Sequence, residues 1–484
     1  MLNYAESKKN VIRYGNFTIN QKMNFIDIQR TLFIQRKQNT SQPNKKIYTK
    51  LNSSVIEAVK KHLGQEQYKD VLRNSFGNEQ KKKELKTIIY NYVASDEFNN
   101  SFKTQIIGFS IEEITNSILE KIAGLGVLQP LDEDVDITDI KIIKYDHIRV
   151  DHIIDGKYKS EIQFDSHEDY VELVQRFAFA ANQNFSHAKP SIDVDFPQMR
   201  INIVGQDLSP SISTHIRKVH KELRYDEKYI IESKLMPLEM INLLKKTYPV
   251  VSQIQVGSRG TGKTESLRFF TGSLPKDKDL LMVEDTPETF MDEIHPEHSI
   301  TMWRNRENSQ DPNKQFGYRH HIRQAMRQNF DYLFIQESRG EESFDILDAA
   351  HTDSIVNTTL HGNSCEGGLD RFISLCQRAL NQNDSYYGKL ISQGFKIVNH
   401  FKRVGKNRVL DESVEVMGYE NGKFILNPLL RFNEVTGEHE IVGQLSEELW
   451  NKISRFHAQY GNSELRELED FKPKSLKKLV GVQG

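Results

Sequence analysis

One octapeptide combines residue types and spacing suited to holding phosphate groups. It consists of Gly257, Ser258, Arg259, Gly260, Thr261, Gly262, Lys263 and Thr264, which meet every fixed position of the pattern G-x-x-x-x-G-K-[ST]. Glycines let successive backbone N–H groups curl around phosphates, and a following helix points its positive end at them. We expect Lys263 to reach the β- and γ-phosphates and the Thr264 hydroxyl to hold Mg²⁺. The octapeptide therefore predicts binding of ATP and Mg²⁺, with a structural glycine turn as the alternative.

Two carboxylates and one histidine follow short apolar runs, where the ends of strands are expected. They are Glu284 after residues 280–283, Glu337 after 332–335 and Gln336, and His361 after 358–360. Ligands of open α/β sheets collect beyond the carboxyl ends of the strands. A carboxylate there can order the shell of Mg²⁺ or deprotonate an attacking water. Glu337 is thus a candidate metal-associated acid and Glu284 a second functional carboxylate, with helix capping as the alternative. For His361 the sequence alone favours a structural role.

The segments that must position these residues alternate between strand-like and helix-like patterns from about residue 250 onward. Short apolar or β-branched runs are separated by helical stretches, and they cover residues 250–256, 280–283, 332–335 and 355–360. A helix-compatible run, 265–270, directly follows the octapeptide. This alternation is typical of a parallel sheet wrapped by helices. The second half of the chain is therefore predicted to be an α/β domain.

Upstream, residues 106–225 show the pattern of a compact α+β domain. Apolar residues with helical spacing occupy 111–122 and end at two glycines, which predicts a helix. A second helix is predicted near 167–181. Strand-like runs occupy 140–143, 147–150 and 199–204. These elements predict a separate domain ahead of the phosphate-binding one.

The composition excludes several classes of protein. With 484 residues, 37% of them apolar and 27% charged, the chain has enough material for two or three globular domains. Two cysteines exclude a disulfide scaffold and a four-cysteine zinc site. A net charge of −2 gives no global indication of nucleic-acid binding. Because no run of 18 apolar residues and no secretory signal is found, we expect a cytoplasmic protein without a membrane span.

The first fifty residues are strongly basic. They contain ten Lys and Arg residues against only Glu6 and Asp27. Such a segment can dock on acidic lipid or on a partner protein. A solvated extension is the alternative. Any contact with the membrane is therefore expected to be peripheral or through a partner.

Four motifs in one order resemble those of the type II/type IV secretion ATPase superfamily. They are the octapeptide, the acidic stretch 283–288, the stretch 325–340 that leads through Glu337, and the histidine-containing stretch 358–364. The segments 124–131, 137–140, 200–202 and 213–217 resemble landmarks of that family's N-terminal domain, and 404–432 resembles the closing strands of its Tad-pilus and conjugation branch. The resemblance spans roughly residues 106–432. Three features depart from it: Gln336 replaces a glycine, segment 351–356 is unusual, and Glu265 follows the octapeptide.

The resemblance implies a RecA-like P-loop ATPase domain preceded by a smaller α+β N-terminal domain, with the nucleotide between them. The corresponding divisions are 1–105 (basic and partly helical), 106–225, 226–440 and a helical tail, 441–484. It also implies roles for five side chains: Glu284 as a catalytic acid or base, Glu337 as the Walker B acid that shares the metal with Thr264, His361 as a sensor near the phosphates, and Arg200 and Arg217 as phosphate-facing arginines.

The function implied is that of an ATP-hydrolysing hexameric motor at the inner face of the cell membrane. It would power secretion, conjugative transfer or pilus assembly, with platform or channel proteins as partners and nucleic acid contacted only indirectly. Two alternatives stay open: an assembly scaffold with little turnover, and a DNA-translocating RecA-like ATPase. Retention of Lys263, Glu284 and Glu337 argues against the first. The second predicts a basic groove rich in aromatic residues, which does not stand out.

Overall fold

The computed structural model describes residues 11–14, 17–20, 51, 53–76, 78–153, 155–196, 198–285, 287–305, 316–461 and 465–475. The chain divides into two compact units, Met1–Glu133 with Phe164–Lys189 and Asp134–Gln163 with Pro190–Gly484. Of the basic segment 1–50, only the strands β1 (Val11–Tyr14) and β2 (Phe17–Asn20) belong to the described residues. The hypothesis that this segment docks on lipid or on a partner falls outside them. The division of the chain at 105, 225 and 440 stays a prediction.

The first unit is helical. Its helices are α2 (Ser53–Leu63), η1 (Glu66–Tyr68), α3 (Lys69–Asn74), α4 (Glu79–Val93), α5 (Asp96–Phe102), α6 (Ile111–Ala123), η2 (Gly126–Leu128), α7 (Gln129–Glu133) and α8 (His167–Ala180). Apolar side chains of α2, α4, α5 and α6 share one core. A capping box formed by Ser110 and Glu113 starts α6, because each side chain accepts a hydrogen bond from the other residue's backbone N–H. The helices predicted at 111–122 and 167–181 are confirmed.

The second unit contains two sheets, of which the smaller has six antiparallel strands in the order β5-β4-β3-β8-β7-β6. Its strands are β3 (Ile137–Lys144), β4 (His147–His152), β5 (Gly156–Lys159), β6 (Ser191–Phe196), β7 (Met199–Val204) and β8 (Ser213–Lys218). Buried and exposed residues alternate strictly along β6, so one face of the sheet packs on a core. The strands predicted at 140–143, 147–150 and 199–204 are confirmed.

The larger sheet has nine strands in the order β11-β10-β12-β13-β9-β14-β15-β16-β17. They are β9 (Ser252–Gly257), β10 (Asp279–Glu284), β11 (Ser299–Arg304), β12 (Tyr332–Ile335), β13 (Ile355–Leu360), β14 (Phe395–Val404), β15 (Asn407–Glu420), β16 (Lys423–Asn433) and β17 (Glu438–Ile441). The strands from β11 through β14 pair in parallel, whereas β14 to β17 form antiparallel hairpins. All four predicted strands of this part are confirmed. So is the fold class, a RecA-like α/β domain preceded by a smaller α+β domain.

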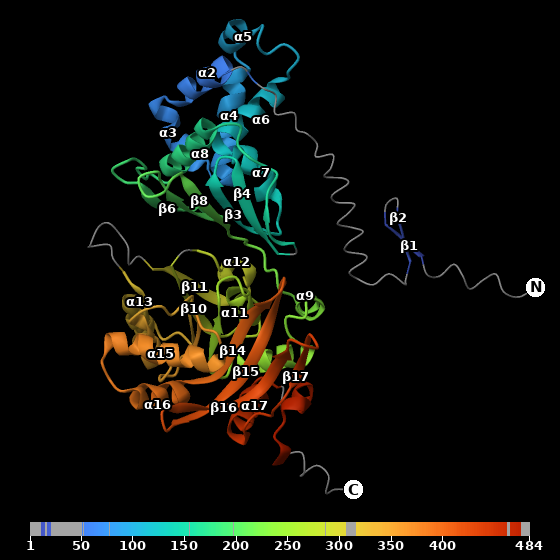
Figure 1. Ribbon diagram of the computed structural model, residues 1–484, viewed down its shortest axis with the longest axis vertical. Coiled ribbons are helices and arrows are strands. Elements are labelled where there is room, and N and C mark those ends of the chain that lie inside the picture. The colour runs from blue at the N-terminus through green and yellow to red at the C-terminus, as the bar shows by residue number, and fades with distance from the viewer. Residues whose placement is uncertain are drawn as a thin grey trace, which may run out of the picture. The chain divides into compact units, whose positions relative to one another are not determined.

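Helices cover both faces of the larger sheet (Figure 1). They are α9 (Glu227–Glu232), α10 (Leu238–Thr247), α11 (Lys263–Thr271), α12 (Met291–Ile294), α13 (Tyr318–Gln328), α14 (Glu342–Ala349), α15 (Cys365–Ala379), α16 (Asp384–Gly394), α17 (Glu447–Gln459) and η4 (Arg466–Phe471). Along β10, Leu280 and Met282 enter the core beneath α10, α11 and α17, whereas Leu281 and Val283 enter the core beneath α13 to α16. Burial on both faces explains why these strands are continuous apolar runs.

The helices give no sign of a membrane-spanning segment. Within the ranges that the structure describes, no helix is both long enough and apolar enough to cross a bilayer. Cys365 and Cys376 are both buried and unpaired.

Candidate functional site

Residues 257–264, the predicted phosphate loop, lie between the central strand β9 and the body of helix α11. β9 ends at Gly257, and α11 begins at Lys263. Gly262 precedes the helix with a φ of 102°, in the left-handed region that favours glycine. A Cβ atom at this position would also overlap the hydroxyl of Tyr225. Residue 262 must therefore be glycine for two independent reasons, and the loop is held between strand and helix as the sequence predicts.

Lys263 is buried at the first position of α11. Its Nζ donates hydrogen bonds to the carbonyl oxygens of Gly257, at 2.6 Å, and Ser258, at 2.9 Å. Burial lowers the pKa of Lys263 to about 8, with a smaller lowering by the charge of Arg259 and an opposing effect of Glu337. The ammonium group is therefore charged at neutral pH and is held by carbonyl groups that phosphate oxygens can replace.

Glu337 and His361 form a pair beside the loop. Nε2 of His361 lies 3.2 Å from Oε1 of Glu337, and Nδ1 lies 3.0 Å from the carbonyl oxygen of Gly257. A carbonyl only accepts, so Nδ1 must carry a hydrogen. Burial and the charge of Lys263 lower the pKa of His361, which favours the neutral ring. The neutral ring turns the lone pair of Nε2 toward Glu337, so a hydrogen bond between the two requires one further proton. Two of the predicted site residues are thus placed together next to the loop.

Glu284 is almost fully buried at the end of β10. Its Oε2 accepts hydrogen bonds from Oγ1 of Thr289, at 2.8 Å, and from the backbone N–H of Thr289, at 3.2 Å. Burial raises the pKa of Glu284, and the bonds from Thr289 oppose this only in part. A carboxylate whose pKa is raised binds a proton more readily than an exposed one, as an acid or base in catalysis must.

Gln336, which departs from the family pattern, joins the acidic stretch to β12. Its Oε1 accepts from the backbone N–H of Asp285 at 3.0 Å, and its Nε2 donates to Glu288 at 3.1 Å. Asp285 also forms an ion pair with Arg339. A glycine at position 336 would leave these two contacts unmade.

The two candidate arginines stand opposite each other on the smaller sheet, Arg200 on β7 and Arg217 on β8. Nη1 of Arg200 lies 3.0 Å from Oε1 of Glu288, and Nε of Arg217 lies 3.1 Å from Oδ1 of Asp139. Burial alone would raise the pKa of Asp139, but the hydrogen bond from His215 and the charge of Arg217 hold it far below its usual range. Each arginine therefore has a carboxylate partner, and a role toward phosphates stays a prediction for both.

Among the residues that the structure describes, possible metal ligands fall in two places. The hydroxyl of Thr264, in the first turn of α11, and the carboxylate of Glu337, after β12, are the pair suggested by the sequence. Elsewhere Asp134, Asp136 and His152 hold ligand atoms within 4.8 Å of one another, a grouping that the sequence did not indicate. It is built from two half-exposed carboxylates, which commonly approach each other without an ion.

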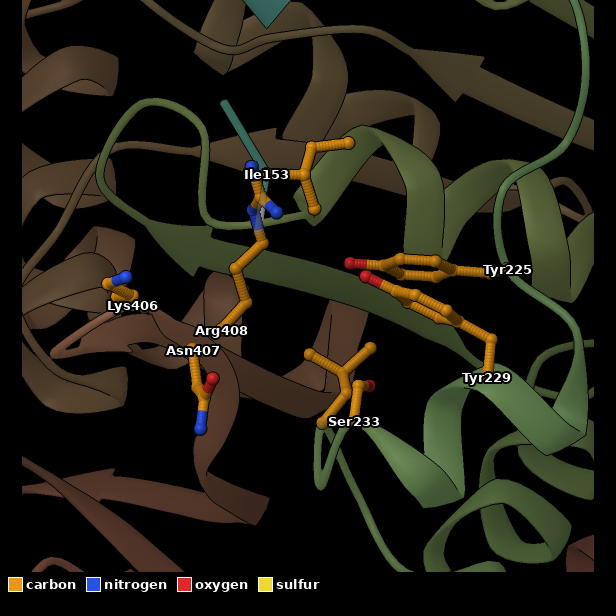
Figure 2. Close-up of a pocket in the computed structure, with 8 residues that line it drawn as sticks. Ile153, Tyr225, Tyr229, Ser233, Lys406, Asn407 and Arg408 are labelled. Atoms are coloured by element: carbon orange, nitrogen blue, oxygen red, sulfur yellow. The ribbon is translucent and has the colours of Figure 1, made fainter. Parts of the chain in front are cut away.

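A pocket next to the phosphate loop was not predicted from the sequence. It is lined by Ile153, Tyr225, Tyr229, Ser233, Leu235, Lys406, Asn407 and Arg408 and has a cavity volume of about 50 Å³. Figure 2 shows the rings of Tyr225 and Tyr229 stacked, with centroids 5.7 Å apart. Nε of Arg408 donates to the carbonyl oxygen of Gly260 at 2.7 Å. The spacing of two tyrosines four residues apart was the only signal in the sequence, and it does not reveal that Tyr225 meets the loop.

The chain is similar to one known protein family and to several known proteins. A family model described as "Type II/IV secretion system protein" matches residues 144–422, more than half of the chain. An uncharacterised protein of Bacillus anthracis is 25% identical over 380 residues, covering 72% of this chain and 80% of that protein. The type IV secretion system protein VirB11 of Brucella suis is 25% identical over 275 residues, covering 51% of this chain and 75% of its own. Among solved structures, the pilus retraction motor PilT with bound ADP has 18% identity and a TM-score of 0.44, covering 73% of this chain and 98% of that chain.

Proposed function

The chain belongs to the type II/IV secretion system protein family, and on this premise we propose that it is an ATPase that powers a secretion machine of the type IV or conjugative kind. One observation carries the proposal. The buried Lys263 and the pair of Glu337 and His361 gather at one carbonyl, that of Gly257, in the phosphate loop. A cation for the phosphates and a base for water are the two groups that hydrolysis of ATP needs most.

Binding of ATP would use the loop and the pocket of Figure 2 together. The backbone N–H groups of residues 257–264 would hold the phosphates, and Lys263 would exchange its carbonyl partners for phosphate oxygens. Thr264 and Glu337 fit Mg²⁺, because a hydroxyl and a carboxylate are hard oxygen ligands. When bound, Mg²⁺ neutralises charge on the β- and γ-phosphates. Tyr229, which is more than a third exposed, offers a ring face for the base.

Hydrolysis would depend on proton transfer at Glu337. Its carboxylate would accept a proton from the attacking water, and the carboxyl group so formed could donate a hydrogen bond to Nε2 of His361. Glu284, with its raised pKa, would serve as a second acid or base. Arg200 and Arg217 would add positive charge to the phosphates after leaving Glu288 and Asp139.

The assembly we propose is a hexameric ring at the inner face of the cell membrane, bound to platform or channel proteins of a secretion system. The similarity to VirB11 supports the type IV branch. Nucleic acid would be contacted only indirectly, through the transported substrate.

The first experiment separates binding from chemistry. Lys263→Ala should lower ATP turnover by about 10²-fold or more, since the charge on the transferred phosphoryl group loses its partner. Glu337→Gln should keep the affinity for ATP and lose turnover, because an amide of the same shape cannot act as a base. Glu341→Gln, an exposed acid nearby, is the control and should behave as wild type. Steady-state phosphate release and nucleotide titration on the same samples decide. Wild-type turnover in Lys263→Ala would refute the proposal, and joint loss of affinity and turnover in Glu337→Gln would make Glu337 structural.

A second experiment tests the pocket. Tyr229→Ala should weaken ADP binding by about tenfold and leave pyrophosphate binding unchanged, because base stacking is worth about 1–3 kcal/mol and pyrophosphate has no base. Tyr386→Ala removes another exposed tyrosine and is the control. Calorimetric titration with both ligands gives the comparison. If the substitution weakened binding of ADP and of pyrophosphate equally, Tyr229 would act through the phosphate loop and not through the base.

A further inference from the structure

Residues 219–226 connect β8 to α9, and residues 221–225 of this linker contact α11 or the phosphate loop before it. Arg268 of α11 makes the main contacts with the linker, and its side chain is only 2% exposed. Its Nη2 donates to the carbonyl oxygens of Lys221, at 2.7 Å, and Glu222, at 3.2 Å. A buried guanidinium is costly to desolvate unless its donors are matched. Here the two linker carbonyl oxygens accept hydrogen bonds from one of the guanidinium nitrogens, Nη2.

Glu265 pairs with another of these donors and also contacts the linker itself. Its Oε1 forms an ion pair with Arg268, three residues further along α11. Its Oε2 accepts a hydrogen bond from the backbone N–H of Arg224 at 3.3 Å. Glu265 thus holds the linker directly and also orients the arginine that holds it. This residue directly follows Thr264, so its backbone is continuous with the part of the loop expected to meet the nucleotide.

The loop itself touches the same linker. The hydroxyl of Tyr225 lies where a Cβ of residue 262 would be. Linker residues 221, 222, 224 and 225 therefore all meet α11 or the loop. Hydrogen bonds weaken steeply with distance and angle, so a shift of the loop or the first turn of α11 must alter this set of contacts.

Occupation of the loop would change the contacts of Lys263, the first residue of α11. Lys263 is bonded to the carbonyls of Gly257 and Ser258, and it must release them to meet phosphate oxygens. Glu265 and Arg268 lie on the same short helix as Lys263. A ligand changes a conformational equilibrium only through contacts that differ between the two states. The contacts of Lys263 at the first residue of α11 differ between the free and the occupied loop. The contacts of Arg268 with the linker carbonyls, in the last turn of the same helix, would change as a result.

We propose that Glu265 and Arg268 are positioning residues that couple occupation of the phosphate loop to the linker 221–225. The coupling rests on the proposed function, because it requires a nucleotide in the loop. It assigns a use to Glu265, whose position after the loop departs from the family pattern. Residues 221–225 follow the strand that carries Arg217, so the coupling gives the loop a mechanical connection toward that arginine.

Amide hydrogen exchange with and without ADP tests the coupling. In the wild-type protein, ADP should slow exchange in residues 257–264 and also, by about fivefold, in the linker, as expected for strengthening a single hydrogen bond. Glu265→Gln should keep the slowing in the loop and lose that in the linker, because the amide cannot accept from both Arg224 and Arg268. Arg268→Lys keeps the charge but not the forked donors, and it should give the same result.

The control is Glu293→Gln. Glu293 accepts from Nζ of Lys221 at 3.1 Å, so it touches the same linker without touching α11. This variant should keep the ADP effect in both segments. Protection of the linker by ADP in Glu265→Gln and Arg268→Lys at the wild-type level would overturn the coupling, as would a wild-type protein in which ADP slows the loop alone. A wild-type protein in which ADP slows neither segment would overturn the proposed function and the coupling together.

Discussion

At the scale of single residues, Lys263 connects the pH of the solution to binding of phosphate groups. Its pKa of about 8 means that the free loop loses its cation as the pH rises through that value. A bound phosphate favours the charged form, so binding above pH 8 requires uptake of a proton. Affinity for pyrophosphate should therefore be nearly constant below neutrality and fall by up to about tenfold per pH unit well above the pKa.

Calorimetry in buffers of different ionisation enthalpy measures the proton uptake directly. Lys263→Arg is the matched control, because arginine stays protonated throughout this range. Any binding that this variant retains should depend far less on pH above 8. Equal pH dependence in both proteins would assign the titration to another group.

The sequence predicted the residues of the candidate site better than their contacts. Lys263 and Glu337 were found because a loop pattern and a strand end are local features, whereas the role of His361 was indicated only by the family resemblance. Their roles stay predictions. The partner of Arg200 is Glu288, and that of Glu265 is the linker near Arg224. These pairs join segments that are distant in sequence, so no local pattern could have indicated them.

At the scale of the elements, the packing of α16 on β15 depends on a missing side chain. Gly388 of α16 lies against the ring of Tyr419, and a Cβ there would overlap the ring. Alanine normally stabilises a helix by about 1 kcal/mol relative to glycine, but overpacking a core costs about 1–3 kcal/mol. We expect the cost of the overlap to exceed the gain in helix stability. Gly388→Ala should therefore lower the free energy of unfolding measured in urea.

Gly418→Ala, on β15, is the control for this substitution. The nearest atom to its Cβ would be Cδ1 of Ile425 at 3.7 Å, an ordinary contact. This variant should unfold at nearly the wild-type urea concentration. Equal stability of the two variants would show that α16 can move away from Tyr419 at little cost.

Strands of the larger sheet were predictable because both of its faces are buried, which turns each parallel strand into an apolar run. The unit to which α8 belongs could not be predicted from the sequence. This helix follows β5 and precedes β6 in the chain, yet it groups with the helical unit and not with the strands around it. Helical periodicity defines the buried face of a helix but not the element that covers it.

At the scale of the whole molecule, the proposed ring makes activity depend on assembly. Specific ATPase activity should rise with protein concentration over a range of about 100-fold, because a bound partner subunit is gained by mass action. Arg217→Ala should lower turnover without unfolding the protein. Light scattering on the same samples reports the number of subunits. Concentration-independent activity from a monomer would exclude the ring, and wild-type turnover in Arg217→Ala would remove that arginine from the reaction.

The central place of β9 in its sheet also has a consequence for biosynthesis. The strand that carries the phosphate loop pairs with β13 and β14, and side-chain contacts join residues 104 and 146 positions apart in the sequence. β9 therefore leaves the ribosome well before either neighbour exists. At roughly 5–20 residues per second, the strand waits on the order of ten seconds for its partners. During that time the unpaired edges and apolar side chains of β9 are available to chaperones, and the loop gains its folded support only after β13 and β14 have been made.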